Sequence, residues 1–124
     1  YDLALGGGGI LDVGGYPVSL ARLIAGAAEG RAFADPVTVK GSGLLAPTGV
    51  DKVAYGLLTF AGGFTAEIAC AVARTMDNRA IITGTSGQIV IDDPWVPGRN
   101  KGPSTTALHI TAGGETRTET LGDH

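Results

Sequence analysis

The residues of this chain best suited to chemistry are Asp12 and Tyr16, which follow a run of four glycines at 6–9. If the segment is helical, a spacing of four residues puts the carboxyl group and the phenol one turn apart on the same face. Backbone without side chains lets another molecule, or another part of the chain, approach the main chain closely. An acid, a phenol and open backbone in one place predict part of a reaction centre.

Each of these residues also has a purely structural explanation. The glycine run is neither a G-x-G-x-x-G turn after a strand nor a phosphate-binding loop that ends in Gly-Lys-Ser/Thr, so it could be a flexible loop before a helix. Asp12 alone is typical of a first-turn acid that the helix dipole favours. Tyr16 alone is typical of core packing. The combination and its order favour the functional interpretation.

The sequence predicts the required helix from about residue 8 to residue 25, with Gly26 as its terminator. Its second half carries an apolar stripe made of Val18, Leu20, Ala21, Leu23 and Ile24. Pro17 leaves two alternatives, because a proline removes one backbone donor and crowds the preceding turn. Either the helix starts at Pro17, or a longer helix is kinked there. We favour the longer helix, which keeps Asp12 and Tyr16 aligned, although a glycine pair within it argues the other way.

After a loop at 27–35 the apolar period changes from helical to two, which predicts strands. The expected strands cover residues 36–45, 53–60, 64–73, 78–84, 88–92, 105–111 and 115–121. Glycine pairs at 62–63 and 113–114 are typical of tight hairpin turns, which need positive φ values. The pattern predicts an α+β fold: a largely antiparallel open sheet of six to seven strands with helix packed on one face. The other face would be available for dimerisation.

Composition and charge limit the classes of function. The 124 residues suffice for one domain, and 44% hydrophobic with 17% charged residues indicates a globular chain. A net charge of −3 with dispersed basic residues argues against nucleic acid as a partner. The longest uncharged apolar run, 53–66, falls short of the ~20 residues that span a membrane, and no signal peptide is recognisable. The single cysteine, Cys70, suits a reducing compartment, so we expect a cytoplasmic protein with no membrane partner.

Three other residues have chemistry to offer. Trp95, the only tryptophan, lies in a proline-containing loop expected at 92–98, where it could anchor the loop or contact a substrate. His109 sits among alternating strand residues, which indicates a structural role. Cys70 lies in an apolar alternating run and is typical of a small core residue. With His109, His124 and one cysteine, the sequence assembles no metal site.

Five spaced motifs resemble one enzyme family. The first is the segment of residues 7–17, Gly-Gly-Gly-Ile-Leu-Asp-Val-Gly-Gly-Tyr-Pro. It resembles the signature that opens the C-terminal domain of the glucose-fructose oxidoreductase / inositol dehydrogenase / rhizopine-catabolism (Gfo/Idh/MocA) oxidoreductases. The other four are Gly49-Val50-Asp51, Phe60-Ala61-Gly62-Gly63, the Ile82–Ile89 hairpin and Asp93-Pro94-Trp95. The tyrosine and the Pro-Trp turn look closest to the dihydrodiol and sugar dehydrogenase branch.

The resemblance implies a role for each matching residue. Asp12 would contact substrate hydroxyls, and Tyr16 would take or return the proton of the reacting hydroxyl. The reaction would transfer a hydride between NAD or NADP and a polyhydroxylated small molecule such as a sugar, polyol or cyclic diol. Trp95 would line the substrate pocket. Gly7, Gly8 and Gly9 would contact the cofactor.

The resemblance also implies a longer protein. The chain starts at Tyr1 without methionine, and it contains neither an E-K-P motif nor a Rossmann glycine turn. We expect residues 1–124 to be a single C-terminal substrate and dimerisation domain, with the N-terminal Rossmann domain that mainly binds the cofactor absent. The fragment alone would be inactive, and the protein would form a homo-oligomer, a dimer or tetramer, through its sheet. The alternatives are a non-catalytic oligomerisation or ligand-binding module with the same fold, and a small β protein that binds a ligand at Trp95.

Overall fold

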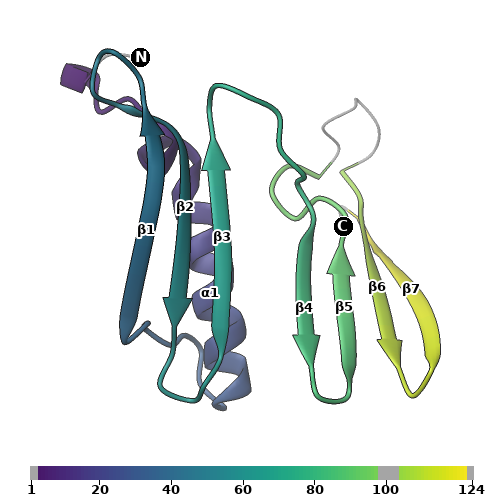
Figure 1. Cartoon of the computed structure of the whole chain (residues 1–124). Coiled ribbons are helices and arrows are strands. Elements are labelled where there is room, and N and C mark those ends of the chain that lie inside the picture. Colours follow the sequence, from purple (N-terminus) through teal and green to yellow (C-terminus); the bar gives the residue numbers. More distant parts are fainter. Residues whose placement is uncertain (1–2, 98–103, 123–124) are drawn as a thin grey trace. The chain divides into compact units, whose positions relative to one another are not determined.

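The computed structural model describes residues 3–97 and 104–122, which divide into two compact units, 1–76 and 77–124. Each unit contains its own antiparallel sheet (Figure 1). His124 and residue 98 of the predicted loop lie outside the described residues.

The first unit begins with a helical segment that passes through Pro17 without a break. After the 3-10 turn η1 (Leu3–Leu5), the π-helix η2 (Ile10–Gly14) leads directly into α1 (Gly15–Ala28). The longer helix is therefore confirmed, and a helix start at Pro17 is wrong. The wider π turn covers the residues whose carbonyls a proline ring at this position would otherwise crowd.

The predicted terminator of this helix was the wrong glycine. The helix runs through Gly26 to Ala28, and Gly30, with φ 73°, ends it. The Arg31 N–H donates to the Gly26 carbonyl at 2.9 Å, the hydrogen bond that closes a glycine-terminated helix. Gly26 serves a different purpose, because a Cβ there would lie 2.6–2.7 Å from backbone atoms of Phe33. It allows the returning chain to pack directly on the helix.

The strands of the first unit form one three-stranded sheet. Its strands β1 (Thr38–Leu45), β2 (Asp51–Thr59) and β3 (Thr65–Ala71) pair in sequential order. The expected glycine hairpin between β2 and β3 is confirmed: the Phe60 N–H donates to the Phe64 carbonyl at 2.9 Å, and Gly63 has φ 84°.

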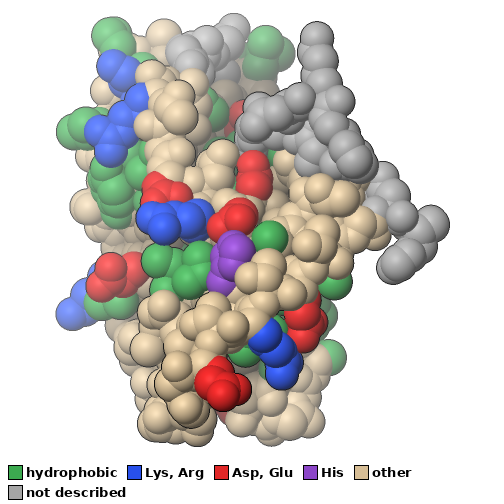
Figure 2. All heavy atoms as spheres, turned by 90° about the vertical axis from the view of Figure 1, so that its right-hand side faces the viewer, with side chains coloured by type: hydrophobic (Ala, Val, Ile, Leu, Met, Phe, Trp, Pro, Cys, Tyr) green, Lys and Arg blue, Asp and Glu red, His purple; other side chains and the backbone are tan. Residues whose placement is uncertain are grey.

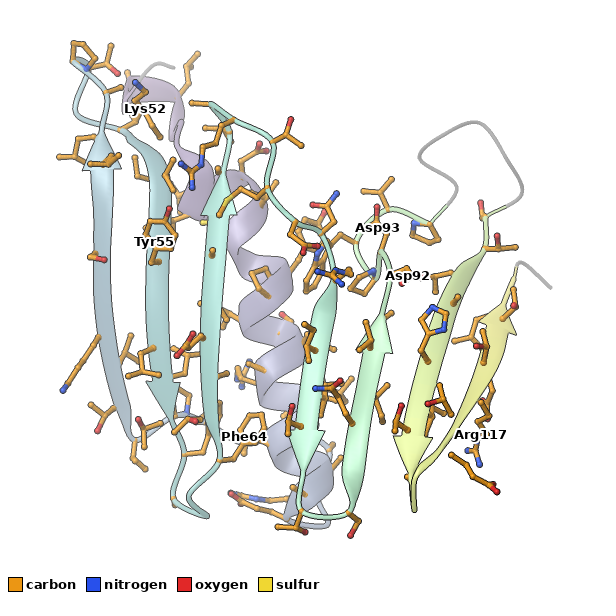
Figure 3. All side chains as sticks on the ribbon, turned by 45° about the vertical axis from the view of Figure 1, so that its right-hand side comes forward. Lys52, Tyr55, Phe64, Asp92, Asp93 and Arg117 are labelled. Atoms are coloured by element: carbon orange, nitrogen blue, oxygen red, sulfur yellow. The ribbon has the colours of Figure 1, made fainter. Side chains whose placement is uncertain are left out.

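Helix α1 covers one face of this sheet (Figure 1). The buried core between them consists of Ala21, Ala25, Ala34, Leu58 and Phe60, with Phe64, Ala66 and Ile68 packed against it. The rings of Phe60 and Phe64 lie 5.4 Å apart, and Figure 3 shows Phe64 near the hairpin end of β3. The alternation of these residues therefore gives the third strand one face that packs against α1.

The strands of the second unit form a four-stranded sheet. They are β4 (Ala80–Gly84), β5 (Gly87–Ile91), β6 (Thr106–Ala112) and β7 (Glu115–Leu121), again paired in sequential order. Gly113 and Gly114, with φ 60° and 83°, form the last predicted hairpin. No described residue of this sheet is fully buried, so its apolar side chains are only partly covered.

The prediction of one continuous sheet is not confirmed, although the α+β class and the expected strands are. The seven strands described pair as separate sheets of three and four. The predicted order relied on β3 and β4 following one another, but eight residues, 72–79, separate them. That segment lacks the two-residue turn that forces neighbouring strands to pair. Instead the Asp77 carboxylate accepts the Arg79 N–H at 3.0 Å and holds a local bend.

Candidate functional site

Asp12 and Tyr16 lie on the same helical segment, and both are exposed. Asp12 is the middle residue of η2, and Tyr16 stands in the first turn of α1 with 59% of its surface exposed. Because the segment is continuous, a separation of four residues keeps the two side chains on one side of it. Core packing as the role of Tyr16 is therefore wrong. π-Helical turns are rare and frequently lie at functional sites.

Another part of the chain packs against the glycine run. Asp51, the first residue of β2, reaches across to it, and its Oδ2 accepts the Ile10 N–H at 2.8 Å. A Cβ on Gly9 would lie 3.0 Å from Oδ2, and one on Gly8 would overlap Oδ1. Gly8 also has φ 127°, which side chains rarely permit. Of the two explanations for the glycines, close approach of another segment is the one the structure shows.

This arrangement bears on the expected cofactor contact. Gly8 and Gly9 are buried, and the carboxylate of Asp51 fills the space beside them. The carboxylate leaves no room for a side chain at Gly8, which explains the glycine there. The cofactor contacts expected at Gly7, Gly8 and Gly9 stay predictions.

Cys70 on β3 lies beneath the start of the helical segment. A Cβ on Gly14 would lie 3.4 Å from its Sγ. Burial, followed by the negative charge of Asp51, raises the pKa of the Cys70 thiol, while a backbone hydrogen bond at Ala54 opposes the shift. Cys70 packs against the helical segment but is only half-buried and is not one of the buried core residues, so the predicted core position is not confirmed.

Cys70 is expected to react more slowly with iodoacetamide at pH 8 than glutathione does, because a raised pKa leaves less thiolate. Removing the Asp51 charge in Asp51→Asn should speed the reaction. The alkylated fraction of the Cys70 peptide, followed over time by mass spectrometry, measures both rates. Wild-type Cys70 reacting faster than glutathione would contradict the description.

Trp95 belongs to the second unit, in the loop that follows β5. It is half-buried, and the Asp93 Oδ1 accepts the N–H groups of Trp95 and Val96, each at 3.2 Å. Figure 3 shows Asp93 projecting from this loop. These hydrogen bonds hold the backbone at Trp95. The contact of its side chain with a substrate stays a prediction.

His109 has the structural role predicted for it. Its Nε2 lies 3.1 Å from the Asp92 Oδ2, and its Nδ1 lies 3.0 Å from the Thr118 Oγ1. The His109 and Asp92 side chains are 37% and 53% exposed, and Figure 2 shows the charged and histidine side chains on this side of the molecule. These contacts tie the start of the Trp95 loop to β6 and β7.

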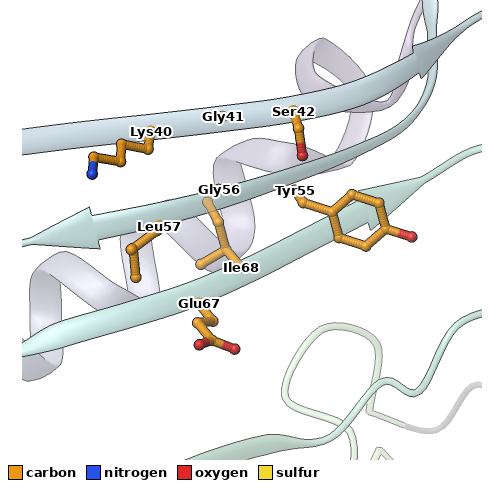
Figure 4. Close-up of a pocket in the computed structure, with 8 residues that line it drawn as sticks. All are labelled: Lys40, Gly41, Ser42, Tyr55, Gly56, Leu57, Glu67 and Ile68. Atoms are coloured by element: carbon orange, nitrogen blue, oxygen red, sulfur yellow. The ribbon is translucent and has the colours of Figure 1, made fainter.

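The three-stranded sheet carries a pocket on the face opposite α1. Its volume is about 330 Å³, and its side-chain lining consists mainly of Lys40, Ser42, Tyr55, Leu57 and Glu67 (Figure 4). The Tyr55 hydroxyl accepts a hydrogen bond from Arg74 at 2.8 Å. Neither Asp12 nor Tyr16 lines this pocket, so it is separate from the predicted reaction centre.

Residues 3–97 and 104–122 lack both a metal-binding cluster and a membrane-spanning helix. These residues contain no group of three or more His, Cys, Asp or Glu that could hold a metal ion. They also contain no helix long and apolar enough to cross a membrane.

Asp51 belongs to a family motif, but the sequence alone predicts no role for it. The available signal was the pairing of two features: glycines where a helix starts without a capping side chain, and an acid opening a distant strand. Such a pairing is visible only once the topology brings residues 41 positions apart together.

Comparison with known proteins decides the family. The family model of the GFO/IDH/MocA C-terminal domain matches residues 1–90. The chain belongs to the GFO/IDH/MocA family. Mouse trans-1,2-dihydrobenzene-1,2-diol dehydrogenase is 33% identical over 91 residues, which cover 73% of this chain and 26% of that protein. The uncharacterized oxidoreductase ORF334 of Rhizobium meliloti is 30% identical over 100 residues, 77% of this chain and 27% of that protein.

Solved structures of other enzymes share the fold. Aldose-aldose oxidoreductase from Caulobacter crescentus, complexed with glycerol, matches 92% of this chain and 31% of its own with a TM-score of 0.73 and 25% identity. The 3-ketoreductase KijD10 from Actinomadura kijaniata, in complex with NADP and TDP-benzene, covers 96% of this chain and 34% of its own with a TM-score of 0.65 and 22% identity. The chain spans about a quarter of the length of the curated relatives it matches.

Proposed function

We propose that this GFO/IDH/MocA chain is the substrate and dimerisation domain of an NAD(P)-dependent dehydrogenase that acts on a sugar, a polyol or a cyclic diol. Its relatives include dehydrogenases named for a cyclic diol, and a similar structure holds glycerol. The observation that carries the proposal is the exposure of Asp12 and Tyr16 on one continuous helical segment, joined by a π turn. A buried or separated pair could not serve one substrate.

Asp12 and Tyr16 have different roles in this proposal. The Asp12 carboxylate accepts hydrogen bonds from substrate hydroxyls and orients the molecule. The Tyr16 phenol takes or returns the proton of the reacting hydroxyl. A cation beside a tyrosine favours the phenolate form, which lets the phenol exchange a proton near neutral pH. We assign that cation, a lysine, to the N-terminal domain that the family resemblance implies.

The cofactor site is also assigned to that N-terminal domain. The Asp51 carboxylate lies beside the buried Gly8 and Gly9, and a negative charge there supports a main phosphate site elsewhere in the full-length protein. When bound, the nicotinamide would supply the hydride acceptor or donor. The present chain on its own is therefore expected to be inactive.

The test of the function uses the protein at its full natural length, with NAD and NADP, and trans-1,2-dihydrobenzene-1,2-diol and aldoses as probe substrates. Asp12→Asn is expected to raise KM about 10- to 100-fold, the effect of weakening hydrogen bonds to a charged group. Asp35→Asn is the matched control, because this carboxylate is 81% exposed and pairs with Arg22. Absence of turnover with every probe would contradict the proposed function.

We propose that the protein dimerises through the face of the three-stranded sheet opposite α1. Tyr55 and Leu57 are 42% and 37% exposed there. In register, Leu57 lies between Lys40 on β1 and Glu67 on β3. A two-fold related copy could therefore meet an apolar centre flanked by opposite charges, as a self-complementary interface requires.

Leu57→Glu is expected to convert the dimer to monomer, because it places a charge at the centre of the interface. Leu23→Glu is the control, since Leu23 is 45% exposed on α1. Sedimentation equilibrium of the full-length protein measures the mass. A wild-type monomer at high concentration, or a Leu57→Glu dimer, would contradict the interface.

A further inference from the structure

We propose that Asp51 is the positioning residue for Asp12: its carboxylate holds the π-helix η2 in place and thereby orients the substrate-binding acid. The inference rests on the proposed function and adds a residue to it. Asp51 does not touch the substrate in this account. It acts through the backbone of the segment that carries Asp12.

The start of the helical segment has no cap of its own. Its N-cap residue is Gly9, and no side-chain hydrogen bond caps it locally. The cap comes instead from β2, where the Asp51 Oδ2 accepts the Ile10 N–H at 2.8 Å. A carboxylate at this end also interacts favourably with the helix dipole.

The connection from Asp51 to Asp12 runs through Gly8. The Asp51 Oδ1 stands where a side chain of Gly8 would be, and the Gly8 carbonyl accepts the Asp12 N–H at 3.1 Å. Asp51 is itself fixed at the start of β2, where it pairs with Leu45 of β1. Asp12 is thus connected to β2 through the backbone of the glycine run, against which Asp51 packs.

Besides Asp51, the π turn contacts β3 through Gly14, which lies against Cys70, but its large side chains take little part. Ile10 is 54% exposed and Leu11 is 73% exposed, and Gly14 is the buried residue of η2. Helix α1, in contrast, is anchored in the core by Ala21 and Ala25. Loss of Asp51 should therefore loosen the segment around Asp12 while Tyr16, on α1, keeps its place.

Hydrogen exchange and steady-state kinetics of the full-length protein test this division. Asp51→Ala is expected to speed exchange of the 10–14 amides by about tenfold relative to the 21–26 amides, the scale of a lost helix cap. With trans-1,2-dihydrobenzene-1,2-diol and NADP, it should raise KM about tenfold and change kcat less than about threefold. Asp51→Asn keeps an oxygen acceptor and should restore both readouts to within about threefold of wild type.

Gly9→Ala gives an independent way to displace the carboxylate. The backbone at Gly9 is right-handed helical, with φ −67°, so alanine is allowed there, but its Cβ would lie 3.0 Å from the Asp51 Oδ2. Gly15→Ala is the matched control, because no atom lies within 4 Å of a Cβ there. Gly9→Ala should speed exchange at 10–14 as Asp51→Ala does, and Gly15→Ala should not.

Double variants identify the residue through which Asp51 acts. Asp51→Ala added to Asp12→Asn should leave KM within about twofold of Asp12→Asn alone, whereas its effect should multiply with that of Tyr16→Phe. Unchanged exchange at 10–14 in Asp51→Ala, equal loosening along α1, or multiplying effects of Asp51→Ala and Asp12→Asn would each overturn the inference. Because hydrogen exchange is measured without turnover, it tests the role of Asp51 even if the full-length protein shows no activity with these substrates.

Discussion

Tyr16→Phe in the full-length protein is expected to lower kcat by about 100-fold or more and to change KM little. The substitution removes the phenolic hydroxyl and keeps the ring, so it deletes proton transfer without emptying a packing site. General acid–base groups contribute about 10²- to 10⁴-fold to rate. The exposure of Tyr16, 59% of its surface, means that the hydroxyl is available to substrate and that its loss costs the fold little.

Tyr55→Phe is the control for this experiment. Tyr55 is also exposed, at 42%, and its hydroxyl accepts a hydrogen bond from Arg74, which follows β3. Tyr55→Phe should retain turnover within about twofold of wild type, because it keeps the ring on the proposed dimer face and changes nothing beside Asp12 or Tyr16. Tyr16→Phe with kcat within a few-fold of wild type would remove Tyr16 from proton transfer.

Gly26→Ala is expected to destabilise the protein by about 3 kcal/mol, the upper end for an overpacked site. The added Cβ would lie 2.6–2.7 Å from the N, Cα and C atoms of Phe33. These are backbone atoms, and the Ala34 N–H next to them donates to the Arg22 carbonyl at 3.0 Å, so the returning chain cannot shift without loss. The clash outweighs the roughly 1 kcal/mol that alanine gains over glycine in a helix.

Gly15→Ala provides the opposite outcome on the same helix. No atom lies within 4 Å of its Cβ position, and its φ of −62° is helical, so the substitution should be neutral or stabilising by up to about 1 kcal/mol. Thermal unfolding of both variants measures the difference. Equal melting temperatures for Gly26→Ala and wild type would show that the helix and the following loop do not pack as described.

Local signals in the sequence were sufficient for most individual elements. The hairpins at 60–64 and 113–114 follow from glycines that take positive φ values, and the seven described strands follow from the period-two apolar pattern. The helical segment through Pro17 was also predictable, although its π turn was not. A π turn depends on how the chain on either side is held, which no local pattern encodes.

Contacts between distant residues leave no local pattern in the sequence. Gly26 fits the pattern of a helix terminator, but its role depends on Phe33, which approaches only after the chain turns back. The glycine run gives no sign of Asp51, which lies on a strand 41 residues away from the amide that it caps. The single sheet was predicted from strand order alone, and the 72–79 connection separates it into two.

A crystal structure of the full-length protein with NADP and trans-1,2-dihydrobenzene-1,2-diol tests most directly whether Asp12 and Tyr16 bind one substrate molecule together. The account predicts a diol oxygen at hydrogen-bond distance, about 2.6–3.2 Å, from the Tyr16 Oη, with the Asp12 carboxylate bonded to the same or the adjacent hydroxyl. A diol bound away from both side chains, for example in the pocket between Lys40 and Glu67, would contradict it.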